Sequence, residues 1–139
     1  MNKIIVAVLS CLLCQSLFAM PARVKYIIDG DTFVADILLK NEIQVKSVSV
    51  RLRNVDTPEI HGKCDLEIKR AYEAKQRLAE LVPVGSIIEI TNIKNDKYAG
   101  RIDANVFDKN GDDVGLVLIK EKYGRAYSGG KREPWCNEK

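Results

Sequence analysis

The stretch from Val50 to Glu59 gathers charged side chains that could act on a phosphate ester. It reads Val-Arg-Leu-Arg-Asn-Val-Asp-Thr-Pro-Glu and continues a strand-like segment. Hydrolysis of a phosphodiester needs this combination, because a hard metal takes oxygen ligands, a carboxylate serves as base and a guanidinium clamps the phosphate. Pro58 pushes Thr57 away from helix, so we expect the carboxylates to lie on a stiff turn.

Acidic residues also stand where two expected strands end. Asp31 follows the Asp29-Gly30 turn, and Asp56 lies in the stretch already described. If the first and third strands are neighbours, Asp31 and Asp56 meet at one end of the sheet. Two carboxylates, a backbone carbonyl and waters would form a hard oxygen site, which suits calcium better than zinc. Taken singly, each motif is more typical of a plain structural turn.

Hydrophobic periodicity predicts the elements that position these residues. Apolar residues alternate along the expected strands and recur at three and four along the expected helices. We expect strands at Arg23–Ile28, Thr32–Leu39, Ile43–Arg53, Ser86–Thr91 and Arg101–Phe107, and helices from Asp65 to Val82 and from Val114 to Lys122. This order favours an α+β fold, a five-stranded OB-fold Greek-key β-barrel with two to three helices.

Helix-terminal residues support this assignment. Asp65 is expected to cap the first helix, and Pro83 ends it. Asp112 or Asp113 is expected to cap the second helix, which Gly124 closes.

The composition is that of one ordinary globular domain. The chain has 139 residues, of which 46% are hydrophobic and 29% are charged, enough to bury a core. The formal net charge of +3 allows an anionic partner but does not require one.

The start of the chain has the pattern of an export signal. Lys3 is followed by the uncharged run Ile4–Phe18, and Ala19 ends a stretch that a signal peptidase could cut. A membrane anchor is the alternative, but about 15 apolar residues fall short of the roughly 20 that a spanning helix needs. We therefore expect a signal peptide at residues 1–19, a domain at residues 20–139, and a periplasmic or secreted protein.

Cysteine usage agrees with export. Cys11 and Cys14 lie in the leader, so Cys64 and Cys136 remain in the expected mature chain. An even count in an oxidising compartment favours a disulfide, which would contribute about 4 kcal/mol in the chain-entropy model. Free thiols or a metal pair are the alternatives, although two cysteines and the single histidine make a poor zinc set.

Several motifs together resemble the staphylococcal nuclease, or thermonuclease, family. They are Asp29-Gly30-Asp31-Thr32, Arg51, Val55-Asp56-Thr57-Pro58-Glu59 and Asp96-Lys97-Tyr98-Ala99-Gly100-Arg101, which stand in the family's order. The resemblance extends from about Arg23 to Tyr127 and implies an OB barrel with helices. Ala99 is an extra residue within one motif, which raises the question of whether Arg101 still reaches the site.

The resemblance implies a role for each matching residue. Asp31, Asp56 and the Thr57 carbonyl would bind Ca²⁺, with Asp29 as a supporting carboxylate. Glu59 would act as the base for the attacking water or position that water, while Arg51 and Arg101 would clamp the scissile phosphate. Lys97 and Tyr98 would meet the terminal phosphate of a bound nucleotide, and Tyr127 would flank its base.

The implied activity is an exported calcium-dependent nuclease that cuts DNA and RNA with little sequence preference and leaves 3′-phosphates. Because every nucleotide carries the same phosphate, the site should be weakly selective for sequence. Base preference would come from stacking and from how easily the strand opens, so single strands and A·T-rich DNA should be cut fastest. We expect a monomer that is not bound to a membrane after signal cleavage.

Two alternatives remain from other classes. One is a non-catalytic OB-fold module that binds single-stranded nucleic acid or protein; the other is a calcium-binding structural protein, which would leave the arginines without a role.

Other polar residues carry weaker predictions. His61 lies in a polar loop and is expected to be exposed rather than catalytic. The family's long final helix is missing here, and we expect the Cys64–Cys136 bridge and packing of Trp135 to replace it. Basic residues that follow the second helix are candidates for contact with a nucleic-acid backbone; they are Lys122, Arg125, Lys131 and Arg132.

Overall fold

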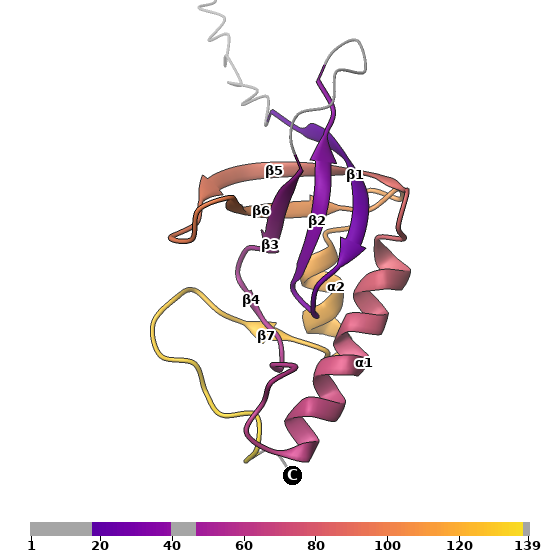
Figure 1. The fold of residues 1–139 in the computed structure, drawn as a ribbon. Helices are drawn as coiled ribbons and strands as arrows, with labels where there is room; N and C mark the ends of the chain where they lie inside the picture. The colour runs from indigo at the N-terminus through magenta and orange to yellow at the C-terminus, as the bar shows by residue number, and fades with distance from the viewer. Residues whose placement is uncertain (1–17, 40–46, 138–139) are drawn as a thin grey trace, which may run out of the picture.

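A closed β-barrel forms the centre of the molecule (Figure 1). The structure is a computed structural model that describes residues 18–39 and 47–137. The barrel strands are β1 (Met20–Ile27), β2 (Thr32–Ile37), β3 (Val48–Leu52), β5 (Ile87–Asn95) and β6 (Arg101–Phe107). Outside the barrel lie α1 (Asp65–Leu81), α2 (Val114–Lys120) and the short pair β4 (Val55–Asp56) and β7 (Arg125–Ala126).

The strand order confirms the predicted fold. Around the barrel the order is β1-β2-β3-β6-β5, and β5 pairs with β1 to close it. All neighbouring pairs are antiparallel except β3 and β6, which are parallel. A five-stranded Greek-key barrel with a helix after the third barrel strand is the OB arrangement.

Two strand boundaries differ from the sequence prediction by four residues or more, and the others agree within three residues. The third strand was expected at Ile43–Arg53, but β3 begins at Val48, and residues 43–46 lie outside the described residues. The fourth was expected to end at Thr91, but β5 continues to Asn95, which pairs with Ile102 beyond an irregularity in the register. Exposed polar side chains in this extension gave no hydrophobic alternation, although backbone pairing with β6 continues.

The predicted Asp65 cap is wrong. Cys64 is the N-cap of α1, has an extended backbone and makes no side-chain cap hydrogen bond. Glu67 turns back instead, and its carboxylate accepts the backbone N–H of Lys63 at 2.9 Å and that of Glu59 at 3.4 Å. For α2 the prediction holds, since Asp113 accepts the N–H of Leu116.

The turn between β1 and β2 is pressed against α1. A Cβ on Gly30 would lie 2.7 Å from the Ala74 Cβ and 2.9 Å from the Thr57 Oγ1. The glycine therefore lets the Asp29–Asp31 turn approach both α1 and the segment after β4. We expect Gly30→Ala to lower the free energy of unfolding by about 1–3 kcal/mol through overpacking. An unchanged urea midpoint for this variant would contradict such close packing.

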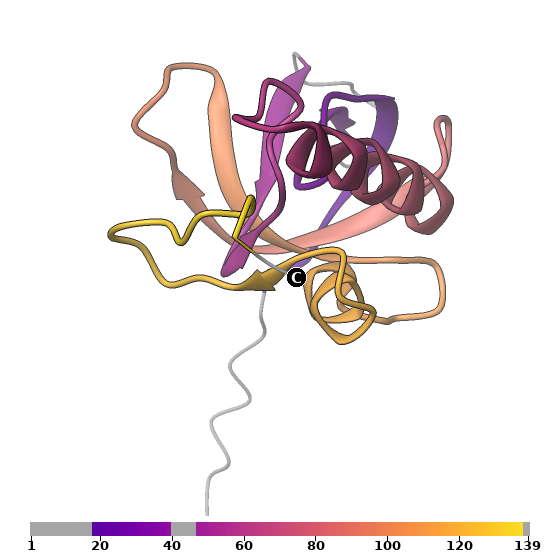
Figure 2. The ribbon, with the colours of Figure 1, turned by 90° about the horizontal axis from the view of Figure 1, so that it is seen from below.

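The C-terminal segment, residues 127–137, is an irregular loop that leaves β7, swings out beside β4 and β7, and continues no helix (Figures 1 and 2). The predicted Cys64–Cys136 disulfide is present, with a Cα–Cα distance of 6.0 Å. Trp135 is buried, and the Arg125 guanidinium lies 3.7 Å from its ring centroid. These contacts fix the segment against the loop before α1.

Removing the bridge is expected to lower the free energy of unfolding by about 4 kcal/mol, because the sulfurs join residues 72 apart in the sequence. Urea unfolding of a Cys64→Ser/Cys136→Ser variant measures this, with the wild type under reductant as a parallel. Equal midpoints in all samples would show that the bridge does not constrain the unfolded chain.

Candidate active site

Asp31 is held in place from three sides. Its side chain is buried, and its Oδ1 accepts a hydrogen bond from the Thr32 hydroxyl at 2.8 Å. Its backbone N–H donates to Asp29 Oδ1 at 3.0 Å. Because Thr32 pairs with Arg51 across β2 and β3, the Arg51 Nη2 reaches to 3.7 Å from Asp31 Oδ2. Strand pairing therefore brings a predicted metal ligand and a predicted phosphate clamp together.

Asp56 is a buried carboxylate with unused acceptor capacity. It is 1% exposed, and within the part of the chain that the structure describes neither carboxylate oxygen accepts a hydrogen bond. Two guanidiniums lie at ion-pair distance: the Arg132 Nε is 3.3 Å from Oδ1, and the Arg125 Nε is 3.5 Å from Oδ2. Buried charges normally need closer compensation, so this carboxylate suits a further cation.

Arg132 links Asp56 to Glu59. The Glu59 side chain is half exposed, and its Oε1 accepts a hydrogen bond from the Arg132 Nη1. Burial lowers the pKa of Arg132, but the charges of Asp56, Glu59 and Asp31 outweigh that effect and raise it. From the sequence, Arg132 was predicted only as one of several basic residues that could contact a nucleic-acid backbone. Nothing in its local pattern indicates the site, because the disulfide four residues later brings it there.

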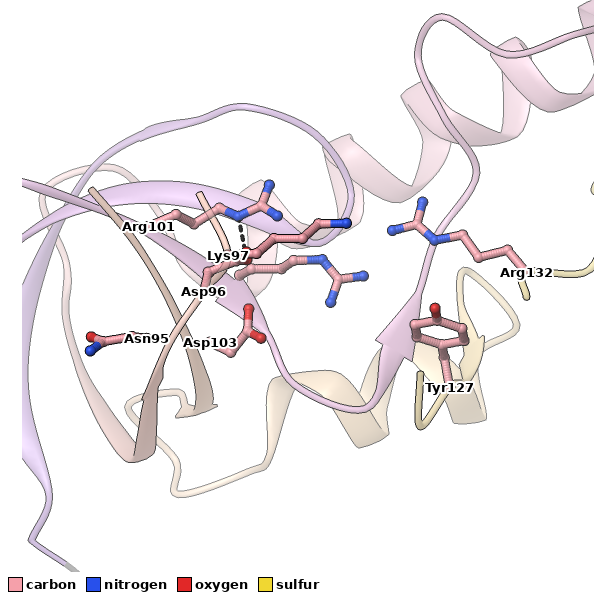
Figure 3. Close-up of a pocket in the computed structure, with 8 residues that line it drawn as sticks. Asn95, Asp96, Lys97, Arg101, Asp103, Tyr127 and Arg132 are labelled. Carbon is pink, nitrogen blue, oxygen red and sulfur yellow. Dashed lines mark hydrogen bonds and ion pairs between the residues drawn. The ribbon is translucent and has the colours of Figure 1, made fainter. Parts of the chain in front are cut away.

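A hollow of about 310 Å³ has Arg132 and Arg51 in its wall (Figure 3). Arg101 and Lys97 enter it from the β5–β6 hairpin, and Tyr127 and Arg132 enter it from the C-terminal segment opposite. Its complete lining is Arg51, Asn95, Asp96, Lys97, Arg101, Asp103, Tyr127 and Arg132. Four cationic side chains around one cavity favour an anionic ligand.

One family pattern, described as Staphylococcal nuclease homologue, matches residues 49–138. The chain belongs to the staphylococcal nuclease family. The match spans well over half of the chain and includes Arg51, Asp56, Glu59 and Arg101. No curated protein matches the chain.

In this nuclease homologue the extra Ala99 leaves Arg101 facing the cavity. The hairpin turn absorbs the residue, since Gly100 has a positive φ of 77° and the Arg101 N–H donates to the Tyr98 carbonyl. The Arg101 Nε donates to Asp96 Oδ2 at 2.5 Å, and this bond holds the pKa of Asp96 down at about 2. Its guanidinium also lies 4.5 Å from the Tyr98 ring centroid.

The remaining predicted residues divide into two groups. Lys97 and Tyr127 line the cavity, and the Tyr127 hydroxyl donates to the Gly130 carbonyl at 2.6 Å. Tyr98 does not line it; this side chain is mostly exposed, and its ring lies against Lys97 and Arg101. His61 is exposed and lies on the wall of a different cavity.

The carboxylates of Asp29, Asp31 and Glu59 repel one another. Burial first, and then the negative charge of Asp31, raise the pKa of Asp29 to about 7, and Glu59 adds to the effect. Crowded carboxylates of this kind are relieved by a bound cation. The hard oxygens of Asp31, Asp56 and the Thr57 carbonyl, together with the unfilled acceptors of Asp56, fit calcium.

One other set of side chains could ligate a metal. Among residues 18–39 and 47–137, Cys64, Glu67 and Cys136 are the group of three His, Cys, Asp or Glu side chains close enough to do so. Both sulfurs are joined in the disulfide, and Glu67 accepts hydrogen bonds from backbone N–H groups. This set is therefore structural.

Proposed function

We propose that the protein is an exported, calcium-dependent nuclease that hydrolyses DNA and RNA with little sequence preference and leaves 3′-phosphate ends. The observation that carries the proposal is that Arg51 and Arg101 line one cavity and the acidic residues contact its arginines. Arg51 lies 3.7 Å from Asp31, and Arg132, on the same cavity, contacts Asp56 and Glu59. Planar guanidiniums each hold two phosphate oxygens, and carboxylates supply a base and metal ligands. Membership of the nuclease family supports the same reaction.

The chain's own groups would share the steps of hydrolysis. Arg51 and Arg101 bind the non-bridging oxygens and stabilise the negative charge that develops there. Glu59 accepts the proton of the attacking water, whose oxygen bonds to phosphorus. The bond from phosphorus to the 5′ oxygen breaks, and that oxygen takes a proton from solvent water, while Glu59 returns its proton to solvent. The products are a 3′-phosphate and a 5′-hydroxyl.

Calcium would be held by Asp31, Asp56 and the Thr57 carbonyl, where it polarises the phosphate when bound. Arg51 lies 3.7 Å from Asp31, so the phosphate clamp and the metal ligands are adjacent.

Substrate choice follows from what lines the cavity. The cations Arg51, Lys97 and Arg101 recognise phosphate, which every nucleotide carries. The aromatic ring of Tyr127 offers a base a stacking surface that tolerates any sequence. Unpaired bases stack most easily, so single strands and A·T-rich duplexes would be cut fastest.

Export is proposed from the leader and the disulfide. Residues 1–17 lie outside the described residues, but β1 begins at Met20. Cleavage after Ala19 would therefore leave the first barrel strand whole. The Cys64–Cys136 bridge suits an oxidising compartment. No helix in the described parts of the chain is long and apolar enough to cross a membrane.

The ends of the products test the reaction. After digestion of heat-denatured DNA and of RNA with calcium, polynucleotide kinase is expected to label the new 5′-hydroxyls without prior phosphatase treatment. New ends that need phosphatase before labelling would contradict the proposed chemistry. Binding of the strands without any cleavage would instead support a non-catalytic OB module.

A further inference from the structure

The groups that a phosphodiester must meet are divided between two cavities. Arg51 and Arg101 line the first, which is the hollow of Figure 3. Asp56 and Glu59 line a second, of about 600 Å³, between the C-terminal segment and the loop before α1. Arg132 lines both cavities. The arginine therefore stands at the junction between the predicted phosphate clamp and the predicted base.

The reaction itself locates the phosphate at this junction. If the proposed function holds, one phosphate must touch the guanidiniums of the first cavity while water is activated by a carboxylate of the second. Arg132 already reaches both carboxylates, with its Nε 3.3 Å from Asp56 Oδ1 and its Nη1 bonded to Glu59 Oε1. A phosphate placed there lies within reach of the same fork.

Covalent and polar contacts hold Arg132 in this position. Cys136 is bonded to Cys64 beside the first turn of α1, and Trp135 is buried against the Arg125 guanidinium. Arg125 also donates to the backbone carbonyl of Glu133, the next residue after Arg132. An arginine fixed in this way loses little conformational entropy on binding a ligand.

We propose that Arg132 is a third active-site arginine, which binds the scissile phosphate at the junction of the two cavities and depends on the Cys64–Cys136 bridge for its position. This inference rests on the proposed nuclease function. Arg132 now contacts Asp56 and Glu59, which a metal ion and the attacking water would engage in the active enzyme. Once these carboxylates bind the metal and the water, the Arg132 guanidinium is free to bind the substrate phosphate.

Oligothymidylate cleavage at saturating calcium tests the proposal in Arg132→Ala, Arg132→Lys and a control, Lys109→Ala. Lys109 is an exposed cation in the turn after β6, away from both cavities. Arg132→Ala is expected to lower kcat/KM about 10- to 100-fold, as for loss of a charged hydrogen bond. Arg132→Lys keeps the positive charge but lacks the two-pronged guanidinium, so its kcat/KM should lie between those of Arg132→Ala and wild type. The kcat/KM of Lys109→Ala should match that of wild type.

Calorimetric titration with calcium separates a role in substrate binding from a structural one. Arg132→Ala should bind calcium at least as tightly as wild type, because a cation next to Asp56 and Glu59 has been removed. Weaker calcium binding together with a lower unfolding temperature would show that Arg132 only supports the fold. Activity above that of wild type would show that Arg132 blocks the site.

Variants of the Cys64–Cys136 bridge test whether the position of Arg132 depends on it. Cys136→Ser should reduce kcat/KM to a similar extent, and the double variant Arg132→Ala/Cys136→Ser should lose little more than Arg132→Ala alone. Additive losses would overturn the dependence on the bridge. If wild type does not cut the oligonucleotide, the proposed function fails; if wild type cuts and Arg132→Ala cuts equally well, only this inference fails.

Discussion

Replacing Glu59 with glutamine is expected to slow DNA hydrolysis about 100- to 10,000-fold, the range for loss of a general base. Glutamine keeps the size of the side chain and can still accept the hydrogen bond from Arg132, but it cannot take a proton from water. Glu59 is half exposed after the Pro58 turn, so the substitution leaves no buried group unpaired. The unfolding midpoint should therefore change little.

Initial rates on heat-denatured DNA at saturating calcium measure this effect. Glu73→Gln is the matched control, because Glu73 is a similarly exposed carboxylate on α1 that lines neither cavity of the site. Near-normal activity of Glu59→Gln would remove Glu59 from the mechanism. Equal losses in both variants would show a general effect of charge rather than base catalysis.

Replacing Arg51 with alanine is expected to lower kcat/KM about 100- to 1000-fold, as for other groups that stabilise charge in a transition state. Arg51 donates to the Val55 carbonyl at 3.3 Å and lies 3.7 Å from Asp31, so its guanidinium is held at the edge of the cavity. Arg51→Lys should remain strongly impaired, because an ammonium cannot bind two phosphate oxygens in a fork.

Arg53→Ala is the control for this prediction. Arg53 comes directly after β3, two residues beyond Arg51. Its Nη1 donates to the Asn92 carbonyl at 2.8 Å, and Arg53 does not line the cavity with Arg101. A steady-state comparison of the three variants should therefore single out Arg51. Full activity of Arg51→Lys would show that charge alone, and not the fork, binds the phosphate.

Most of the barrel could be predicted because its strands and turns are marked by short local sequence patterns. Alternation identified the strands, and Asp29-Gly30 marked the turn that brings β2 back along β1. The expected neighbourhood of the first and third strands is wrong, because β2 lies between β1 and β3. The contact of Asp31 with Arg51, which arises from the β2–β3 pairing, was not predicted. Other details failed for physical reasons: the β5 extension consists of exposed residues, Ile93 included, that bury no face, and Cys64 takes the cap position that Asp65 was expected to hold.

The role of the C-terminal segment could be predicted only in part. The sequence indicated that Cys64 and Cys136 would form a bridge and that Trp135 would pack, and the structure contains both features. The position of Arg132 depends on the path of the chain between β7 and that bridge, which has no periodicity. Only three-dimensional placement reveals its contacts with Asp56 and Glu59.

The most direct measurement is digestion of heat-denatured DNA by the purified protein, first with calcium and then with an excess of calcium chelator. We expect rapid cleavage with calcium, none with chelator, and recovery when calcium is restored. Cleavage that continues in chelator would contradict the calcium site at Asp31, Asp56 and Thr57. A folded protein that does not cut DNA in either condition would contradict the nuclease proposal.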